Sequence, residues 1–424
     1  MFDAEFIKNP YPTYQHLLTN SRIHFIEHFG GAWLVTHYDD ALDVLRDARF
    51  SAARASSFVE LFPPEQREQI QDLGRCLSMW LVVLDGGEHL RLRRLLNKAF
   101  TPRTIENMRP AIEQLADTLI DRLIAEMQTQ GQADLLQTFA HPLPAMIIAQ
   151  LLGVQAEDQL KFVRWSDELA RYAASMTPDL EIALTAQDAL HHMLDCFRAV
   201  LAERRREPQD DFVTLLLSAE EQDVGLTEEE ILAQCTLFLL AGHETTRNLI
   251  GNGMLTLLQH PEQRALLRRE PSLIRSALDE MLRYQSPTQT AGRIATEDLE
   301  LFGQSIKAGQ TMLILLGAVN RDPDHFSDPD RFDITRAERR PLSFGHGPHV
   351  CIGMALALLE GEIAFTRLLR LPNIQLVSTD LQWSPIFALR GLLELPITFD
   401  TQPETDDPPQ HSHSAGVCPF HANA

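Results

Sequence analysis

One cysteine stands near the end of the stretch Phe344-Gly345-His346-Gly347-Pro348-His349-Val350-Cys351-Ile352-Gly353, just before a predicted helix that begins at Met354. The glycines allow backbone angles and close approaches that other residues cannot adopt, and the proline lacks an N–H donor. The loop is therefore expected to be irregular and lean. A thiolate in front of a helix lies near free backbone N–H groups, which lower a cysteine's pKa. These residues leave two interpretations open: a thiolate ligand for haem iron, or a small buried apolar residue in a capping loop.

Length and composition restrict the class of protein. The chain has 424 residues, an apolar fraction of 44% and a formal charge of −22, which argues against a nucleic-acid binder. No apolar run approaches the length of a membrane span, and the N-terminus does not resemble a signal peptide, so a soluble cytoplasmic protein is expected. Reduced thiols suit that compartment, because the five cysteines are scattered and do not form a disulfide framework: Cys76, Cys196, Cys235, Cys351 and Cys418.

The pattern along the chain is mainly helical with small sheets, an α+β class. Apolar spacing predicts a hairpin (23–26 and 33–36), a short helix (39–46), nearly continuous helices (88–270), a helix to residue 284, strands (299–302, 311–315), a helix from 354 to about 371, and terminal strands (375–399). One large domain over 1–400 is expected. Residues 401–424 are expected to form a disordered tail, although their histidines and Cys418 could also ligate a metal or haem.

The longest predicted helix runs from about 227 to 259, roughly 50 Å. Thr227 and Glu230 have the spacing of a capping box. Its middle reads Ala241-Gly242-His243-Glu244-Thr245-Thr246, and an acid with two hydroxyls is costly to bury in an apolar run without partners. A second interpretation is a helix kink at the glycine and threonines, with the acid facing solvent or an arginine.

Both segments resemble one family. The order Phe-Gly-x-Gly-x-His-x-Cys-x-Gly resembles the haem-binding loop of the cytochrome P-450 family, and Ala-Gly-x-Glu-Thr-Thr is similar to its oxygen-activation segment. The resemblance implies a single triangular-prism domain that holds haem b between the long central helix and the helix after the cysteine. It implies Cys351 as the iron ligand, favouring O–O cleavage, in a loop with Phe344, Gly345 and Gly353.

The resemblance also implies roles in the long helix. Gly242 would leave room for dioxygen, Thr245 would donate a hydrogen bond to it, and Glu244 would relay protons through water. Such a relay has no use in a passive haem carrier.

Three sets of charged residues acquire roles by the same resemblance. Buried haem propionates need cationic partners, expected to be His89, Arg93, Arg293 and His349. Glu280, Arg283 and Arg331 would form a Glu-Arg-Arg network that fixes the cysteine loop. The alternative for these residues is an ordinary surface ion pair. The remaining basic residues, Arg91, Arg94, Lys98 and Arg103, would dock an acidic ferredoxin, where a solvated charged face is the alternative.

The predicted function is that of a monomeric haem-thiolate monooxygenase. It would insert one atom of O2 into a small, mostly apolar organic substrate by hydroxylation or epoxidation, in secondary or specialised metabolism, with electrons from a ferredoxin and its reductase. Two alternatives remain: oxidative coupling or desaturation at the same centre, and a non-catalytic haem sensor or carrier. By family position the substrate pocket would be lined by Trp80, Leu240, Ala241, Thr288, Gln289, Thr290, Phe387 and Ala388.

Overall fold

The structure is a computed structural model that describes residues 2–28, 31–54, 59–155, 158–173, 175, 179–209, 211–221, 225–338 and 340–399. The predicted disordered tail over 401–424 lies outside these residues. Within them, none of the helices combines the length and the apolarity that a membrane-spanning segment needs.

Helices form most of the described chain. They are α1 (Ala4–Lys8), α2 (Tyr11–Asn20), α3 (Tyr38–Arg46), α4 (Pro64–Gln69), α5 (Gln71–Ser78), α6 (Gly86–Leu96), α7 (Pro102–Asn107), α8 (Arg109–Gln130), α9 (Pro142–Leu151), α10 (Gln159–Ala173), α11 (Leu180–Arg206), α12 (Phe212–Glu221), α13 (Glu228–Gln259), α14 (Pro261–Arg269), α15 (Ile274–Tyr284), α16 (Leu316–Val319) and α17 (Met354–Leu368). Short 3-10 turns lie at Leu81–Val83, Pro271–Leu273, Leu342–Phe344 and Gly347–His349, and a π-helical turn at Leu136–Ala140.

The strands form three small sheets. The largest has the order β1-β2-β8-β5-β3, built from β1 (Ile23–Ile26), β2 (Ala32–Val35), β8 (Thr311–Leu315), β5 (Thr290–Ala295) and β3 (Phe50–Ser51). β2 and β8 run parallel, with Trp33 opposite Met312, and the other pairs are antiparallel. The smaller sheets are β4 (Ala133–Asp134), β10 (Pro396–Phe399) and β9 (Ile374–Leu376), and the hairpin of β6 (Leu299–Leu301) and β7 (Gln304–Ile306).

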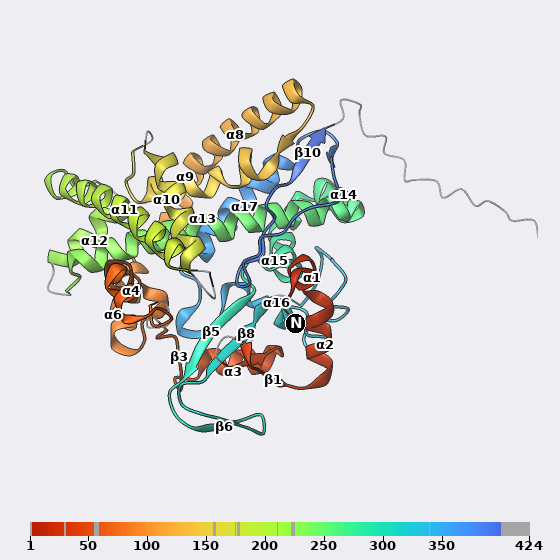
Figure 1. Cartoon of the computed structure of the whole chain (residues 1–424). Helices are drawn as coiled ribbons and strands as arrows, with labels where there is room; N and C mark the ends of the chain where they lie inside the picture. The colour runs from red at the N-terminus through yellow and green to blue at the C-terminus, as the bar shows by residue number, and fades with distance from the viewer. Residues whose placement is uncertain are drawn as a thin grey trace, which may run out of the picture.

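Figure 1 shows the strands of the largest sheet gathered on one side and the helices α8 to α13 on the other, with α13 and α17 packed together at the centre. This helix pair positions the site. Glycines allow the close packing, because a Cβ on Gly253 of α13 would lie 2.6 Å from the Phe365 ring of α17. A Cβ on Gly361 of α17 would lie 2.8 Å from Leu278.

Most of the predicted elements are confirmed. The hairpin, the strand over 311–315 and the long helix have nearly the predicted bounds. Thr227 caps α13 through the predicted capping box, accepting from the Glu230 N–H at 3.2 Å. Two predictions differ from the structure: α17 ends at Leu368 before the predicted 371, and most of 375–399 is irregular between β9 and β10. The strand β5 was not predicted.

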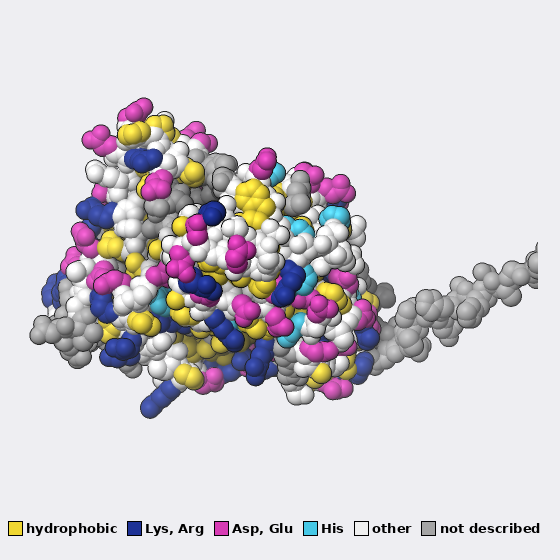
Figure 2. All heavy atoms as spheres, turned by 90° about the horizontal axis from the view of Figure 1, so that it is seen from below, with side chains coloured by type: hydrophobic (Ala, Val, Ile, Leu, Met, Phe, Trp, Pro, Cys, Tyr) yellow, Lys and Arg dark blue, Asp and Glu magenta, His cyan; other side chains and the backbone are white. Residues whose placement is uncertain are grey.

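Charge is distributed rather than segregated on the face that carries the largest sheet. Figure 2 shows acidic and basic side chains interspersed over this face, seen from below. The net charge of −22 therefore does not produce a uniformly acidic surface here.

Candidate functional site

The loop around Cys351 is held by its own backbone. The Cys351 N–H donates to the Phe344 carbonyl at 2.9 Å, and the Gly345 N–H donates to the Leu342 carbonyl at 2.8 Å. Gly345 and Gly347 have φ of +70° and +72°, a region that favours glycine. A Cβ on Gly347 would lie 2.7 Å from the Leu45 carbonyl of α3, so the loop packs directly on that helix. The predicted lean, irregular loop is confirmed.

Burial raises the pKa of Cys351 above its usual value, whereas the backbone N–H groups of Gly353 and Met354 and the charge of Arg93 lower it. The predicted effect of the helix start is therefore present, but the loss of water around the sulfur outweighs it in this structure. The side chain remains accessible to a ligand. A cation bound to the sulfur would supply the stabilisation that the protein alone does not.

A group of cationic side chains, here called the cationic cluster, comprises His89, Arg93, Arg293 and His349. The rings of His89 and His349 lie 4.1 Å apart, and His349 Nε2 is 3.2 Å from Asp85 Oδ1. His89 and Arg293 are buried, which excludes a solvated charged face for these two. The buried Nε2 of His89 has no hydrogen-bond partner among the described residues.

The electrostatics of this cluster disfavour the charged form of its histidines. Burial, the neighbouring histidine and Arg293 lower the pKa of His349 to about 4, opposed by Asp85. Burial and Arg93 likewise lower the pKa of His89. An anion would relieve this repulsion and accept from the unpartnered nitrogen. The two propionates of a haem fit that requirement, and the thiol of Cys351 fits its iron.

Sequence reasoning missed Arg54 at this place. Burial and the adjacent charge of Arg293 lower the pKa of Arg54 to about 10. Its guanidinium also approaches the Ala52 carbonyl at 3.3 Å. Nothing in the surrounding sequence marks this arginine, because it reaches the cluster only through the pairing of β3 with β5.

On α13 the acid and the hydroxyls are partnered locally. Glu244 accepts from Arg247 at 3.0 Å and from Asn248 at 3.3 Å. Thr245 donates to the Ala241 carbonyl at 3.0 Å. The predicted contact of the acid with an arginine is therefore present, but α13 continues through this segment as one helix.

Gly242 has a packing reason that the sequence did not reveal. A Cβ there would lie 3.0 Å from Ile148 Cγ1, so the glycine lets α9 approach α13. The expected role of Gly242 beside dioxygen stays a prediction.

A second acid, Glu360 of α17, was also missed. It is buried, hydrogen-bonds to Thr246, and burial raises its pKa to about 8. Its spacing could have revealed it, because it stands on the apolar stripe of the helix, four residues after Leu356 and three before Ile363. This carboxyl holds a proton at neutral pH.

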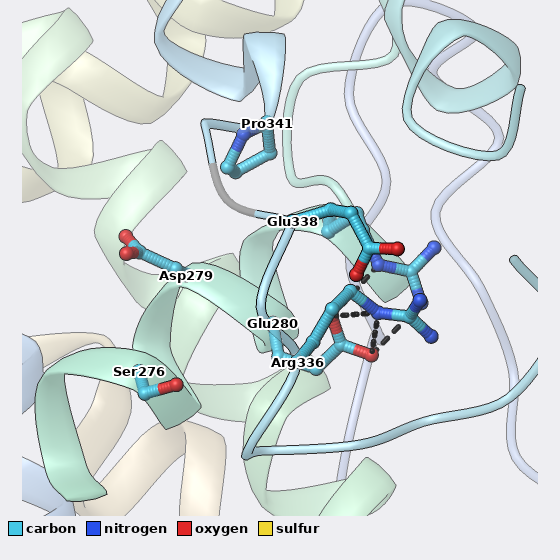
Figure 3. A pocket seen from close by; sticks show the side chains of 7 residues that line it. Ser276, Asp279, Glu280, Arg336, Glu338 and Pro341 are labelled. Carbon is cyan, nitrogen blue, oxygen red and sulfur yellow. Dashed lines mark hydrogen bonds and ion pairs between the residues drawn. The ribbon is translucent and has the colours of Figure 1, made fainter. Parts of the chain in front are cut away.

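The predicted Glu-Arg-Arg network is present, but its third residue is a different arginine. Glu280 accepts from Arg283 at 2.7 Å and from Arg336 at 3.1 Å, and all three side chains are buried. Figure 3 shows the Glu280 and Arg336 side chains pointing toward each other. We call these three residues the Glu280 network, and its burial excludes a surface ion pair.

Arg331 is a correction. Its side chain is 64% exposed and lies 3.6 Å from Asp333, while its carbonyl accepts from Arg283 and Arg336. The network still reaches the cysteine loop, because Arg283 donates to the Asn320 carbonyl and Asn320 Oδ1 accepts from the Leu342 N–H at 2.7 Å.

The predicted docking residues divide into two groups. Arg91 pairs with Glu88 and Glu230 and donates to the Gly225 carbonyl, so its charge is already used within the chain. Arg94, Lys98 and Arg103 are exposed.

Several predicted pocket residues are engaged elsewhere. Trp80 is buried and donates from Nε1 to Thr236 at 3.1 Å. Gln289 is buried, accepting from Tyr14 at 2.7 Å and donating to the Ser286 carbonyl, and Phe387 packs on the rings of Phe2 and Phe6. The expected place of these three side chains in a substrate pocket stays a prediction. Leu240, Thr288, Thr290 and Ala388 are half-buried and Ala241 is exposed.

Comparison with known proteins agrees with the geometry. A family profile described as Cytochrome P450 matches residues 73–393. The chain is 40% identical to the Biotin biosynthesis cytochrome P450 of Bacillus subtilis (strain 168), over 94% of this chain and 98% of the relative. It is 38% identical to the 6-deoxyerythronolide B hydroxylase of Saccharopolyspora erythraea, over 92% and 96%. A crystal structure of P450BioI with an acyl carrier protein bearing hexadec-9Z-enoic acid superposes with a TM-score of 0.85 at 38% identity, covering 93% of this chain and all of that chain.

Proposed function

Because this chain belongs to the cytochrome P450 family of haem-iron oxidoreductases, we propose that Cys351 is the thiolate ligand of a haem b. In this proposal the chain inserts one atom of O2 into a small, mostly apolar organic molecule, with electrons from a ferredoxin. The observation that carries the proposal is the accessible Cys351 sulfur beside a buried cationic cluster whose His89 donor has no partner. Bound haem supplies the reductive activation of O2.

The chain's own residues move the protons. Arg247 holds the Glu244 carboxylate in place. From that position the carboxylate can pass protons from water to the neighbouring Thr245. Thr245 lies adjacent and donates to the Ala241 carbonyl. Rotation of that hydroxyl away from the carbonyl would free its hydrogen to donate into the site, while its lone pairs accept from water.

The experiment is Thr245→Ala in the haem-loaded enzyme. The variant should bind haem and substrate normally but divert reducing equivalents into hydrogen peroxide, since the proton reaches the wrong oxygen. Thr256→Ala is the matched control, because Thr256 makes the same bond to a preceding carbonyl, 2.7 Å to Asn252, in the same helix. An unchanged ratio of product to consumed reductant in Thr245→Ala would remove Thr245 from the mechanism.

The substrate class has two candidates. The first is a compact apolar molecule, as the half-buried Leu240 and exposed Ala241 favour. The second is a long acyl chain, free or bound to a carrier protein, because the structural neighbour P450BioI is solved with such a ligand. A binding-spectrum screen of terpenoids, macrolides, free fatty acids and acyl carrier proteins separates them. In turnover assays with the compounds that bind, oxidative coupling or desaturation would appear as products without added oxygen.

The basic residues near the cysteine loop are proposed to dock the ferredoxin. Arg94, Lys98 and Arg103 are exposed, so they can attract an acidic partner. Reversing Arg94 and Lys98 to glutamate should slow reduction at low salt and weaken its salt dependence, because screening has less attraction to remove. Equal reduction rates for the reversed and native proteins would place the docking site elsewhere.

A further inference from the structure

Four potential metal ligands, Glu244 among them, lie close together where three helices meet. They are His141, just before α9, Asp167 of α10, and His243 and Glu244 of α13. One ligand atom from each residue lies within 4.8 Å of the other three. None of the roles proposed above uses His141, Asp167 or His243.

The orientation of His243 indicates which atom is available. Its Nδ1 lies 2.8 Å from the Leu239 carbonyl, which can only accept, so Nδ1 carries the hydrogen. Its Nε2 then faces Asp167 Oδ1 at 3.1 Å, and this ring has no exposed surface. A lone pair on that nitrogen would oppose the carboxylate, so a positive species, a proton or a metal ion, belongs between the two atoms. A carbonyl bond on the other ring nitrogen is typical of histidines that bind metals.

The other ligands complete the set. His141 Nε2 lies 3.9 Å from Asp167 Oδ2, and the His141 and His243 rings are 5.6 Å apart and nearly perpendicular. Arg247 and Asn248 both donate to the Oε1 atom of Glu244. The Asp167 side chain is 45% exposed, which gives an ion a route in and lets this ligand move.

We propose that these four residues form a Zn²⁺ site. Two imidazoles and two carboxylates suit Zn²⁺, whereas Mg²⁺ and Ca²⁺ prefer oxygen ligands throughout. Bonds of about 2.0–2.2 Å around a tetrahedral ion place the ligand atoms about 3.3–3.6 Å apart. His243 Nε2 and Asp167 Oδ1, at 3.1 Å, are already this close, whereas wider pairs such as His141 Nε2 and Asp167 Oδ2, at 3.9 Å, contract around the metal. Rotation of the partly exposed Asp167 and His141 allows that contraction.

Zinc at this place would inhibit turnover. Glu244 as a ligand can no longer exchange protons with water, and the ion competes with Arg247 for its carboxylate. This consequence rests on the proton role of Glu244 in the proposed function, whereas the binding site does not.

The test measures binding on the haem-loaded enzyme. Protein treated with a chelator is dialysed against defined free Zn²⁺, and bound zinc is counted by mass spectrometry. One zinc per chain is expected, and Asp167→Asn and His141→Ala should each weaken binding by at least about tenfold. Excess Mg²⁺ should not displace the zinc.

Two control variants test whether other histidines bind the zinc. His192→Ala removes an exposed histidine that lies 3.6 Å from Asp188, and zinc binding should be unchanged. A variant with alanine at His411, His413, Cys418 and His421 removes the potential ligands at the C-terminal end of the sequence and should also retain the site. Loss of zinc in either control, or equal binding by the native and Asp167→Asn proteins, would overturn the proposal and leave a His243–Asp167 ion pair.

A turnover assay distinguishes the proposed Zn²⁺ site from the proposed proton role of Glu244. Zinc should increase peroxide release by the native enzyme and have no such effect in Asp167→Asn. If zinc binds with the predicted dependence on His141 and Asp167 but coupling is unchanged, the site stands and the proton role of Glu244 falls.

Discussion

Two buried polar groups of residues on either side of the cysteine loop differ in one respect. In the Glu280 network, one carboxylate accepts from two arginines, and backbone carbonyls take further arginine donors. In the cationic cluster, two arginines and two histidines lie near each other with Asp85 as the opposing carboxylate, and the His89 Nε2 is unpartnered among the described residues. Native proteins rarely leave buried polar groups unsatisfied. The complete group is therefore structural, and the incomplete one is the place where an anionic ligand belongs.

Breaking the complete group should have the largest effect. Arg283→Ala or Arg336→Ala leaves the buried Glu280 carboxylate with one arginine and the Asp333 N–H as donors, which should lower the free energy of unfolding by about 3–5 kcal/mol. Urea unfolding of the haem-loaded protein measures this. Arg331→Ala is the matched control and should stay within about 0.5 kcal/mol, because the network uses only the Arg331 carbonyl and the exposed side chain makes only a 3.6 Å ion pair with Asp333. The reverse order of effects would restore Arg331 as the third member.

Removing a cation from the cationic cluster should have opposite effects on the haem-loaded and the haem-free protein. Arg293→Met should weaken haem retention roughly ten- to a hundredfold, the worth of a charge-assisted hydrogen bond. In the haem-free chain the same change should leave stability equal or higher, because it removes a buried cation from among other cations. Haem transfer to a globin acceptor and urea unfolding measure the two quantities. Arg94→Met, on an exposed side chain of the same charge, is the control. Equal destabilisation of both states would make the cluster structural.

Glu360 is a third kind of buried polar group. Its carboxyl is neutralised by a bound proton rather than by a charged partner. Its folded pKa of about 8 lies above the usual 4.5, so unfolding releases a proton between these values. Native stability should therefore fall as pH rises through this window, by up to about 1.4 kcal/mol per pH unit. Glu360→Gln does not titrate, so its stability relative to the native protein should increase from pH 6 to 8. A constant difference across that range would contradict the buried neutral acid.

The sequence predicted the features that depend on neighbouring residues. Glycine and proline around Cys351, and the Thr227 and Glu230 capping pair, act over a few positions, and the structure has the expected loop and helix start. Features formed by distant segments were missed. The strand β5 exists through its pairing with β8 and β3, and its own residues do not alternate in polarity.

The site follows the same rule. Arg336 replaces Arg331 because the chain between them folds back on Glu280, which no spacing reveals. Arg54, Asp167 and His141 reach their positions through tertiary packing alone. The helix start lowers the pKa of Cys351 as predicted, but the sequence did not show the burial that outweighs this effect.

The measurement that tests the account most directly is the absorption spectrum of the reduced, carbon monoxide-bound protein. With Cys351 as the thiolate ligand, the native chain should show the red-shifted Soret band from which the family takes its name. Cys351→His should keep some haem and lose that band, while Cys196→Ser, at a half-buried free cysteine, should keep it. A red-shifted band that persists in Cys351→His would mean that another residue holds the iron and would contradict the account.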